Sequence, residues 1–172
     1  GTDGAGRIVI SGPTTGSGDL IIGESTAFAS GSTGQQLTWF AEVCLSGPAA
    51  LPSGNLSFGG NGVLELGNGD FTRALGTGPG QVQMPTNAGG GWAAVGADRA
   101  VNIGGAGTTL TWGQTSPPFL YRDGPSVNDF GQLILGSPSA THTVEFQNAL
   151  LFPAAASYLI NRQVVCRDGT AA

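Results

Sequence analysis

Clusters of glycine interrupt this chain at short intervals and leave room for little except short strands joined by turns. Gly accounts for 31 of the 172 residues, without the Gly-X-Y period of collagen. Because Gly disfavours helix interiors, and because stretches rich in Ala, Glu, Lys and Leu are missing, a helical bundle is excluded. Gly and Asn tolerate the positive φ angles that tight corners need. The sequence therefore predicts an all-β chain with turns at 59–62, 67–70, 89–91 and 104–107.

Short runs of β-forming residues alternate with these clusters, which fits a sandwich, a barrel or a β-solenoid. An apolar-x-apolar unit followed by Gly-Gly or Asn-Gly recurs at 56–60, 64–69 and 101–105. Recurrence of one turn chemistry favours stacked coils, and a β-sandwich is the alternative. A turn of helix is the expectation for part of 148–158. Strands are expected at 7–10, 20–22, 37–45, 55–58, 63–66, 81–84, 92–95, 100–103, 108–112, 132–135, 142–146 and 159–166.

The charge pattern excludes several classes of protein. The net charge is −5, all six cations are Arg, and no basic patch exists, so we expect no nucleic-acid partner. No apolar run is long enough for a membrane span. A hydrophobic share of 40% is too high for a disordered tail, and the length suits one domain over 1–172. Because the chain begins with Gly, we expect it to be a processed or excised portion of something longer.

Residues suited to catalysis or metal binding are sparse. The single histidine, His142, lies in an alternating run and is expected to face solvent or to fill a ladder position. No nucleophile elbow, P-loop, dinucleotide fingerprint or calcium-binding repeat is present. We therefore predict that the protein is not an enzyme and has no catalytic residue, metal or cofactor. The glutamates form no acid–base motif in the sequence; they are Glu24, Glu42, Glu65 and Glu145.

Cys44 and Cys166 allow one disulfide, within or between chains, or two buried free thiols. In a rod of stacked coils their separation corresponds to about five coils, too far for an intrachain bridge unless the N-terminal segment folds back. Otherwise Cys166 of one copy would meet Cys44 of the next. Asn55 opens an N-glycosylation sequon, and Thr14 with Thr15 is a candidate O-glycan site.

A series of short sequence motifs over residues 50–172 resembles those of the autotransporter-associated β-strand repeat proteins, which are bacterial surface and secreted proteins built as parallel β-solenoids. Residues 24–48 and 117–129 depart from the pattern. The resemblance implies a right-handed parallel β-solenoid, an extracellular structural role and no catalytic residue. The motifs include GVLELGNGDFTR at 62–73, GADRAVNIGG at 96–105, ATHTVEFQN at 140–148 and DGTAA at 168–172.

The two ends of the chain predict self-assembly. In the family, DGTAA is followed by a strand that resembles residues 8–20 of this chain, so the C-terminus of one copy would continue into the N-terminus of the next. We expect a homopolymeric, head-to-tail surface fibre with about eight coils per copy and an axial repeat of roughly 35–45 Å. The predicted joint consists of Arg7, Ile8, Val9, Ile10, Val164, Val165 and Asp168.

The alternative function is an adhesin or a carbohydrate-binding module that recognises surface glycans. Aromatic rings offer flat apolar surfaces on which a sugar ring can stack. A binding module of this kind should present a concave, aromatic-rich site and remain monomeric. The candidate aromatic residues are Trp39, Trp92, Trp112, Tyr121 and Tyr158.

Overall fold

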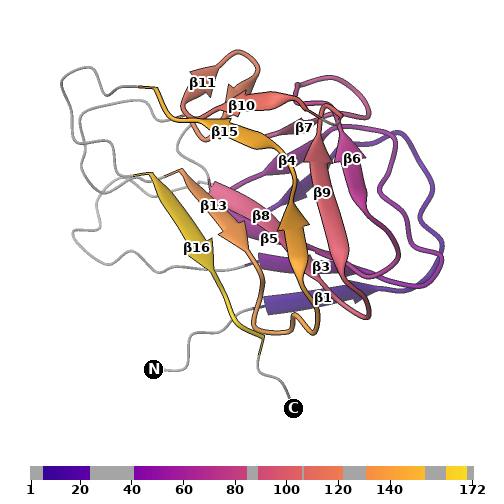
Figure 1. Ribbon diagram of the computed structural model, residues 1–172. Coiled ribbons are helices and arrows are strands. Elements are labelled where there is room, and N and C mark those ends of the chain that lie inside the picture. The colour runs from indigo at the N-terminus through magenta and orange to yellow at the C-terminus, as the bar shows by residue number, and fades with distance from the viewer. Residues whose placement is uncertain are drawn as a thin grey trace, which may run out of the picture.

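The computed structural model describes residues 6–23, 41–84, 89–105, 107–121, 131–153 and 162–169. Every regular element in these ranges is a β-strand, so the all-β prediction is confirmed there (Figure 1). None of these residues belongs to a helix that could cross a membrane. The strands are β1 (Gly6–Ile10), β2 (Leu20–Ile22), β3 (Ala41–Leu45), β4 (Leu56–Phe58), β5 (Asn61–Leu66), β6 (Phe71–Arg73), β7 (Val82–Gln83), β8 (Gly89–Ala94), β9 (Arg99–Ile103), β10 (Thr109–Thr111), β11 (Gln114–Thr115), β12 (Pro118–Phe119), β13 (Gln132–Leu135), β14 (Val144–Phe146), β15 (Ala149–Leu151) and β16 (Gln163–Cys166).

Parallel pairing joins strands that are distant in the sequence. The largest sheet, sheet A, has six strands in the order β1-β3-β5-β8-β13-β16, and all of its pairings are parallel. Three smaller parallel sheets are sheet B (β2-β4-β7), sheet C (β14-β9-β6) and sheet D (β10-β15). Antiparallel pairing in the described ranges is confined to the β11–β12 hairpin and one bridge between Ala94 and His142.

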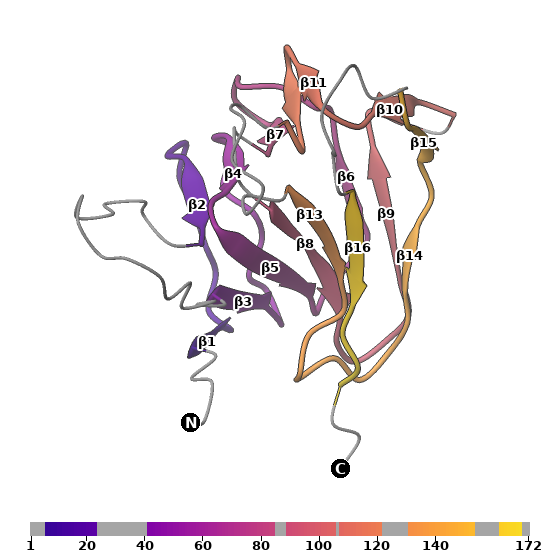
Figure 2. The same cartoon turned by 90° about the vertical axis from the view of Figure 1, so that its left-hand side faces the viewer.

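From β5 onward the chain passes repeatedly from sheet A to sheet C and then to sheet B or D. It passes through sheet A (β5), sheet C (β6) and sheet B (β7), and then returns to sheet A at β8. The next two circuits run through β8, β9 and β10, and through β13, β14 and β15, before the chain reaches β16. Successive passes therefore lie side by side in sheets A and C, and the last two also in sheet D, as the two views of the cartoon show (Figures 1 and 2).

The main core lies between the sheets and is built from alternating residues. Leu64 and Trp92 are register partners on β5 and β8, and both are fully buried. The Trp92 ring contacts Phe58 and Phe71, each with a ring-centroid separation of 5.1 Å, so it links strands of sheets A, B and C. Burial of such large aromatic side chains is a major source of stability in a chain with so much Gly.

A second, smaller core lies on the outer face of sheet A. Val63, Ala93 and Ile134 are buried there, and Ala140 and Val165 pack against them. Gly91 lies between Val63 and Ile134 in the register. A Cβ atom at Gly91 would lie 1.7 Å from the Ile134 carbonyl oxygen, so only Gly allows β13 to approach β8 this closely.

Several local predictions need correction. The segment 148–158 contains β15 rather than a helical turn where it is described, because Ala149–Leu151 pairs with β10. Residues 41–45 form β3, as the strand predicted at 37–45 required, although 24–48 departs from the repeat pattern. β6 was not predicted at all, since its three residues follow directly on a Gly/Asn cluster. The predicted strand residues 37–40 and 159–161, like most of 24–48 and 117–129, lie outside the described ranges.

Candidate functional site

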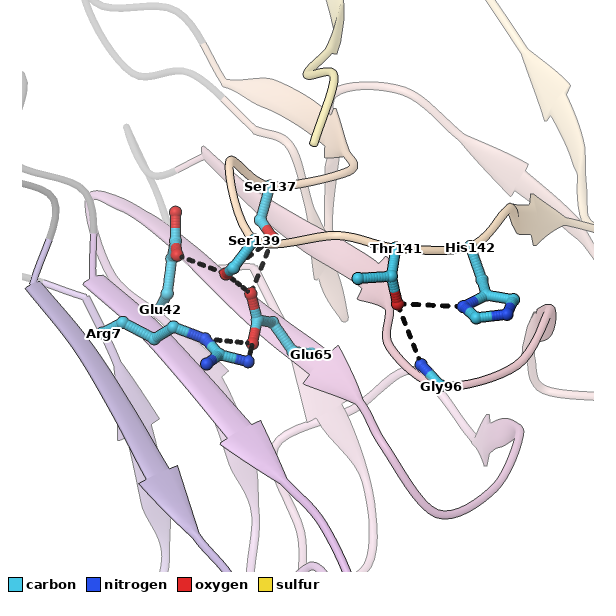
Figure 3. A network of polar contacts seen from close by, with 8 residues as sticks. All are labelled: Arg7, Glu42, Glu65, Gly96, Ser137, Ser139, Thr141 and His142. Atoms are coloured by element: carbon cyan, nitrogen blue, oxygen red, sulfur yellow. Dashed lines mark hydrogen bonds and ion pairs between the residues drawn. The ribbon is translucent and has the colours of Figure 1, made fainter. Parts of the chain in front are cut away.

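Two buried glutamates lie on the outer face of sheet A, covered by the segment that follows β13 (Figure 3). Glu42 on β3 is 2% exposed, and Glu65 on β5 is fully buried. The alternation of side chains along each strand turns both away from the main core, since Val43 and Leu64 point into it. Each glutamate stands alone in an apolar strand, and parallel pairing places the two strands side by side.

Glu65 has a complete set of hydrogen-bond donors. Arg7 on β1 donates from Nε to Oε2 at 2.8 Å, and its Nη2 forms an ion pair with the same oxygen at 2.8 Å. The Ser137 hydroxyl donates to Oε1 at 2.6 Å, and the Ser139 hydroxyl forms a short hydrogen bond with the same oxygen. Charge-assisted bonds of this kind hold a carboxylate in its ionised form.

Glu42 has far fewer partners. Its Oε2 lies 3.2 Å from the Ser139 hydroxyl, and its Oε1 is buried without a hydrogen-bond partner among the described residues. Ser139 therefore stands between the two carboxyl groups. The cluster joins β1, β3 and β5 to the segment after β13, which brings together residues as far apart as 7 and 139.

The two carboxyl groups have opposite electrostatic environments. Burial raises the pKa of Glu42, and the charge of Glu65 raises it further, against smaller opposing effects of Ser139, Arg167 and Arg7. Burial would also raise the pKa of Glu65, but hydrogen bonds from Ser137, Ser139 and Arg7 outweigh it and hold that pKa below the ordinary value. Two adjacent groups with pKa values driven apart are typical of a proton-donor and proton-acceptor pair.

The exposed apolar side chains define a second candidate site, at the edges of the sheets. In the described ranges all large exposed apolar residues lie on, or directly beside, four outer strands. One group belongs to β1 and β2 and the other to β15 and β16, at opposite ends of the sheet order (Figure 2). The residues are Ile8, Val9, Ile21, Leu151, Phe152 and Val164.

The backbone direction at β1 follows from its contact with the chain after β3. The Ser46 N–H donates to the Ile10 carbonyl at 3.0 Å. Because the N–H and C=O of one residue point to the same side of a strand and alternate along it, Ile8 and Ile10 direct their backbone groups to β3. Arg7 and Val9 therefore direct theirs to the outer edge of sheet A.

The same argument applies to β16 at the other edge. The Arg167 N–H donates to the Leu135 carbonyl at 2.9 Å, so Val165 faces β13. Val164 and Cys166 consequently direct their backbone groups to the outer edge. Each edge of sheet A thus offers backbone donors and acceptors that no described strand uses.

The structure separates the predicted joint residues into two groups. Ile8, Val9, Val164 and Asp168 are exposed. Arg7 contributes its backbone to the edge, but its side chain is bound to Glu65. The side chains of Ile10 and Val165 pack inward, against the main core and the outer core respectively.

Both cysteines are free thiols, and no disulfide joins them. Cys44 on β3 shares the outer face of sheet A with Glu42, whereas Cys166 alternates with Val165, which packs on that face, and so points the other way. The strands β5, β8 and β13 also lie between β3 and β16. Cys166 is exposed and Cys44 is buried, so Cys44 is not accessible to a neighbouring copy either.

The glycosylation candidates have structural roles. Asn55 is 2% exposed, and its Nδ2 donates to the carbonyls of Gly76 and Gly78 at 3.0 and 2.9 Å. A glycan on this nitrogen would have no space in the fold, so the sequon is not a usable site in the folded protein. The Thr14 hydroxyl is engaged with the backbone N–H and carbonyl of Ala50, while Thr15 is exposed.

The predicted aromatic platform does not form where it can be assessed. Trp92 is fully buried and Trp112 is 3% exposed. Trp112 stacks on Phe152 at a centroid separation of 5.5 Å, beside β15. Tyr121 is partly buried, and Trp39 and Tyr158 lie outside the described ranges. His142 was predicted to face solvent or to fill a ladder position. It is exposed to solvent, and its Nδ1 lies 2.9 Å from the Thr141 hydroxyl (Figure 3).

Two hollows lie in the described part of the molecule, and neither contains the glutamate pair. A cavity of about 310 Å³ is lined mainly by Leu45, Leu51, Leu64, Leu66 and Phe71, with Asp70 at its rim. A shallower depression of about 420 Å³ lies over sheet C and has acidic walls. Asp70 and Asp98 at its border each accept a backbone N–H, from Ala100 and Thr143, at 2.9 Å.

Comparison with known proteins gives no assignment. No family model, no curated protein and no solved structure matches the chain. The function must therefore be inferred from the geometry of the chain itself.

Proposed function

We propose that this protein is a subunit of an extracellular fibre, a right-handed parallel β-solenoid that stacks head to tail with copies of itself. Two kinds of observation support the solenoid: parallel pairing in sheets A to D, and the ordered circuits through sheets A, C and B or D. Antiparallel pairing, which a β-sandwich requires, joins only the short β11–β12 pair and one bridge among the described residues.

The observation that carries the assembly is the pair of apolar edges. Val9 is 50% exposed on one edge of sheet A and Val164 is 48% exposed on the other. The edge strands of two other sheets are apolar as well, since Ile21 on β2 of sheet B is 67% exposed and Leu151 on β15 of sheet D is 52% exposed. Unpaired strand edges with apolar side chains favour addition of another strand.

The register inside sheet A extends naturally across such a joint. The partners Leu135 and Cys166 show the rule: the residue after Cys166 donates its N–H to the Leu135 carbonyl. If Cys166 takes Ile8 of the next copy as its partner, the next N–H is that of Val9. This N–H faces the outer edge, so it can donate to the Cys166 carbonyl. The contact is heterologous, and an open filament is expected unless the rotation closes a ring.

A proline substitution at Val9 tests the joint. Val9→Pro removes an N–H that faces outward, so it should block strand addition while leaving the pairing of β1 with β3 in place. Val9→Thr is the matched control, because it keeps the N–H and a β-branched side chain. We expect wild type and Val9→Thr to form filaments in electron micrographs and fast-sedimenting species, and Val9→Pro to remain a folded monomer by circular dichroism and sedimentation.

The proposal fails if wild type sediments as a monomer at high concentration, or if Val9→Pro assembles as well as Val9→Thr. Mass spectrometry under denaturing conditions distinguishes stacked separate chains from copies linked in one polypeptide. The alternative, a carbohydrate-binding module, has less support, because Trp92 and Trp112 are buried.

A further inference from the structure

The number of hydrogen atoms in the glutamate cluster limits which of its polar contacts can be hydrogen bonds. A serine hydroxyl carries one hydrogen. Ser139 contacts both carboxyl groups, but its contact with Glu65 is the short one, while that with Glu42 is 3.2 Å. The Ser139 hydrogen therefore belongs to the bond with Glu65. For the contact between Ser139 and Glu42 to be a hydrogen bond as well, the hydrogen must come from Glu42.

We propose that Glu42 is a neutral carboxylic acid in the folded protein, and that its proton acts as a clamp that holds the segment 136–141 on the outer face of sheet A. The Glu42 O–H donates to Ser139, which donates to the ionised Glu65, which also binds Arg7. When Glu42 ionises, its proton passes to solvent and the donor to Ser139 is lost.

The unpartnered oxygen of Glu42 supports the neutral form. An isolated charge in a protein interior costs far more than a neutral polar atom. If Glu42 carries its proton on Oε2, the buried Oε1 is the carbonyl oxygen of an acid rather than part of a carboxylate. The raised pKa of Glu42, caused first by burial and then by Glu65, has the direction that this arrangement requires.

Charged or titratable groups reach the cluster from β1, β3, β5 and the residue after β16. Arg7 comes from β1, Cys44 from β3, Glu65 from β5, and Arg167 from the residue after β16. Arg7 is bound to Glu65 by a hydrogen bond from Nε and an ion pair through Nη2. Ionisation of Glu42 would place a second carboxylate against the same serine as Glu65, and like charges at this distance repel. This repulsion by Glu65 is larger than the attraction of Arg167 or of Arg7.

The covering segment is anchored at both ends by hydrogen bonds that do not involve the glutamates. Its start is fixed by the Gly136 N–H, which donates to the Trp92 carbonyl at 2.8 Å. Its end is fixed by the Thr141 N–H, which donates to the Ala94 carbonyl, and by the Thr141 hydroxyl, which accepts from Gly96. Between these anchors Ser139 contacts Glu42, while Ser137 and Ser139 both bind Glu65 and Ala140 packs against the outer core. Ionisation of Glu42 should therefore loosen residues 137–140 and increase their transient opening.

A carboxyl-selective NMR titration tests the proton directly. The chain contains only four glutamates, so protein labelled with ¹³C at the Glu carboxyl carbon gives few signals. We expect one signal to titrate above the ordinary glutamate pKa and to vanish in Glu42→Gln. Sequential assignment identifies the signal if that variant does not fold. A Glu42 signal that titrates at or below the ordinary glutamate value would overturn the proposal.

Hydrogen exchange tests the clamp. After correction for intrinsic exchange, opening of residues 137–140 should increase by up to tenfold per pH unit between the ordinary glutamate pKa and the raised value of Glu42. Glu42→Gln should abolish this dependence, because the glutamine amide donates to Ser139 at any pH. Glu145→Gln, an exposed carboxyl on sheet C, is the matched control and should keep it. Exchange independent of pH in wild type would refute the clamp, whether or not filaments form.

Discussion

At the scale of single residues, stability depends on polar side chains that replace backbone partners in the turns. Asn55 precedes β4 and Asn148 precedes β15, and both are buried. Asn148 accepts the Ile103 N–H at 2.6 Å and donates to the Ile103 and Thr108 carbonyls at 2.8 and 3.1 Å. Buried backbone groups left without partners would each cost about 1–3 kcal/mol. These amides therefore tie each pass of the chain to the next.

The loss of folding stability at acid pH should depend on Glu65. Because its pKa is lower in the folded than in the unfolded protein, the folded state binds fewer protons, and the stability from Glu65 is present above the ordinary glutamate pKa. This stability is lost as the pH falls through the pKa that Glu65 has in the folded protein. Chemical unfolding from pH 7 to pH 2 should show this loss in wild type.

Glu65→Gln should be less stable than wild type at pH 7, by about 2–3 kcal/mol because Arg7 is partly exposed, and should lose less on acidification. Glu145→Gln serves as the exposed control. If Glu65→Gln loses as much stability on acidification as wild type does, that loss arises from other carboxyl groups.

The two thiols should differ in reactivity. Cys166 is exposed, whereas Cys44 is buried, and burial followed by the charge of Glu65 raises the pKa of the Cys44 thiol. Labelling of the native monomeric Val9→Pro variant with a maleimide should therefore modify one site rapidly and the second only after unfolding. Peptide mapping should place the fast label on Cys166. Two equally fast sites, or none, would contradict the assignment.

At the scale of elements, the run Gly89–Gly91 at the start of β8 decides how closely neighbouring strands approach. A Cβ atom at Gly90 would lie 2.6 Å from atoms of Phe58, and one at Gly91 would meet the β13 backbone. The other side of β8 pairs with β5 over its full length. The glycines therefore let β8 contact the main core on one side and support the outer core on the other.

Replacement of Gly91 by Ala should be strongly destabilising. The added methyl group cannot be accommodated by a side-chain rotation, because it collides with backbone atoms of Ile134. We expect a loss of more than about 3 kcal/mol in chemical unfolding, or failure to fold. Gly69→Ala is the matched control, since nothing lies within 4 Å of its Cβ position, and it should change stability by less than about 0.5 kcal/mol. Equal effects of the two substitutions would argue against the close approach of β13.

At the scale of the whole molecule, the strand count of sheet A fixes the length that one copy would add to a filament. The sheet has six strands rather than the eight coils expected from the sequence. At about 4.8 Å per strand, the axial repeat should be about 29 Å instead of 35–45 Å. Layer lines in images of wild-type filaments measure it. A repeat much longer than this would mean that undescribed residues or a gap separate the stacked sheets.

The fold class and many of the strands could be predicted from the sequence, because strand formation here depends on local patterns. Alternating apolar residues bounded by Gly/Asn clusters placed strands at Leu20–Ile22 and Gln132–Leu135 with the bounds that the structure has. β6 and β15 were not predicted as strands, and a turn of helix was considered for 148–158, since three-residue strands carry little periodic signal. The residues of the proposed joint were predicted from the order of motifs, and only the structure shows which of them face outward.

The glutamate cluster could not be predicted, although each glutamate is conspicuous as a single charge in an apolar strand. Its geometry depends on which strands become neighbours and on where the segment after β13 crosses the sheet. Arg7, Glu42, Glu65 and Ser139 are separated in the sequence by lengths that follow no period. The sequence alone determined that this chain forms short strands and glycine corners, because backbone preferences act locally. The tertiary structure decided which carboxyl groups meet and which thiol is buried, because burial and charge interactions depend on distances through space.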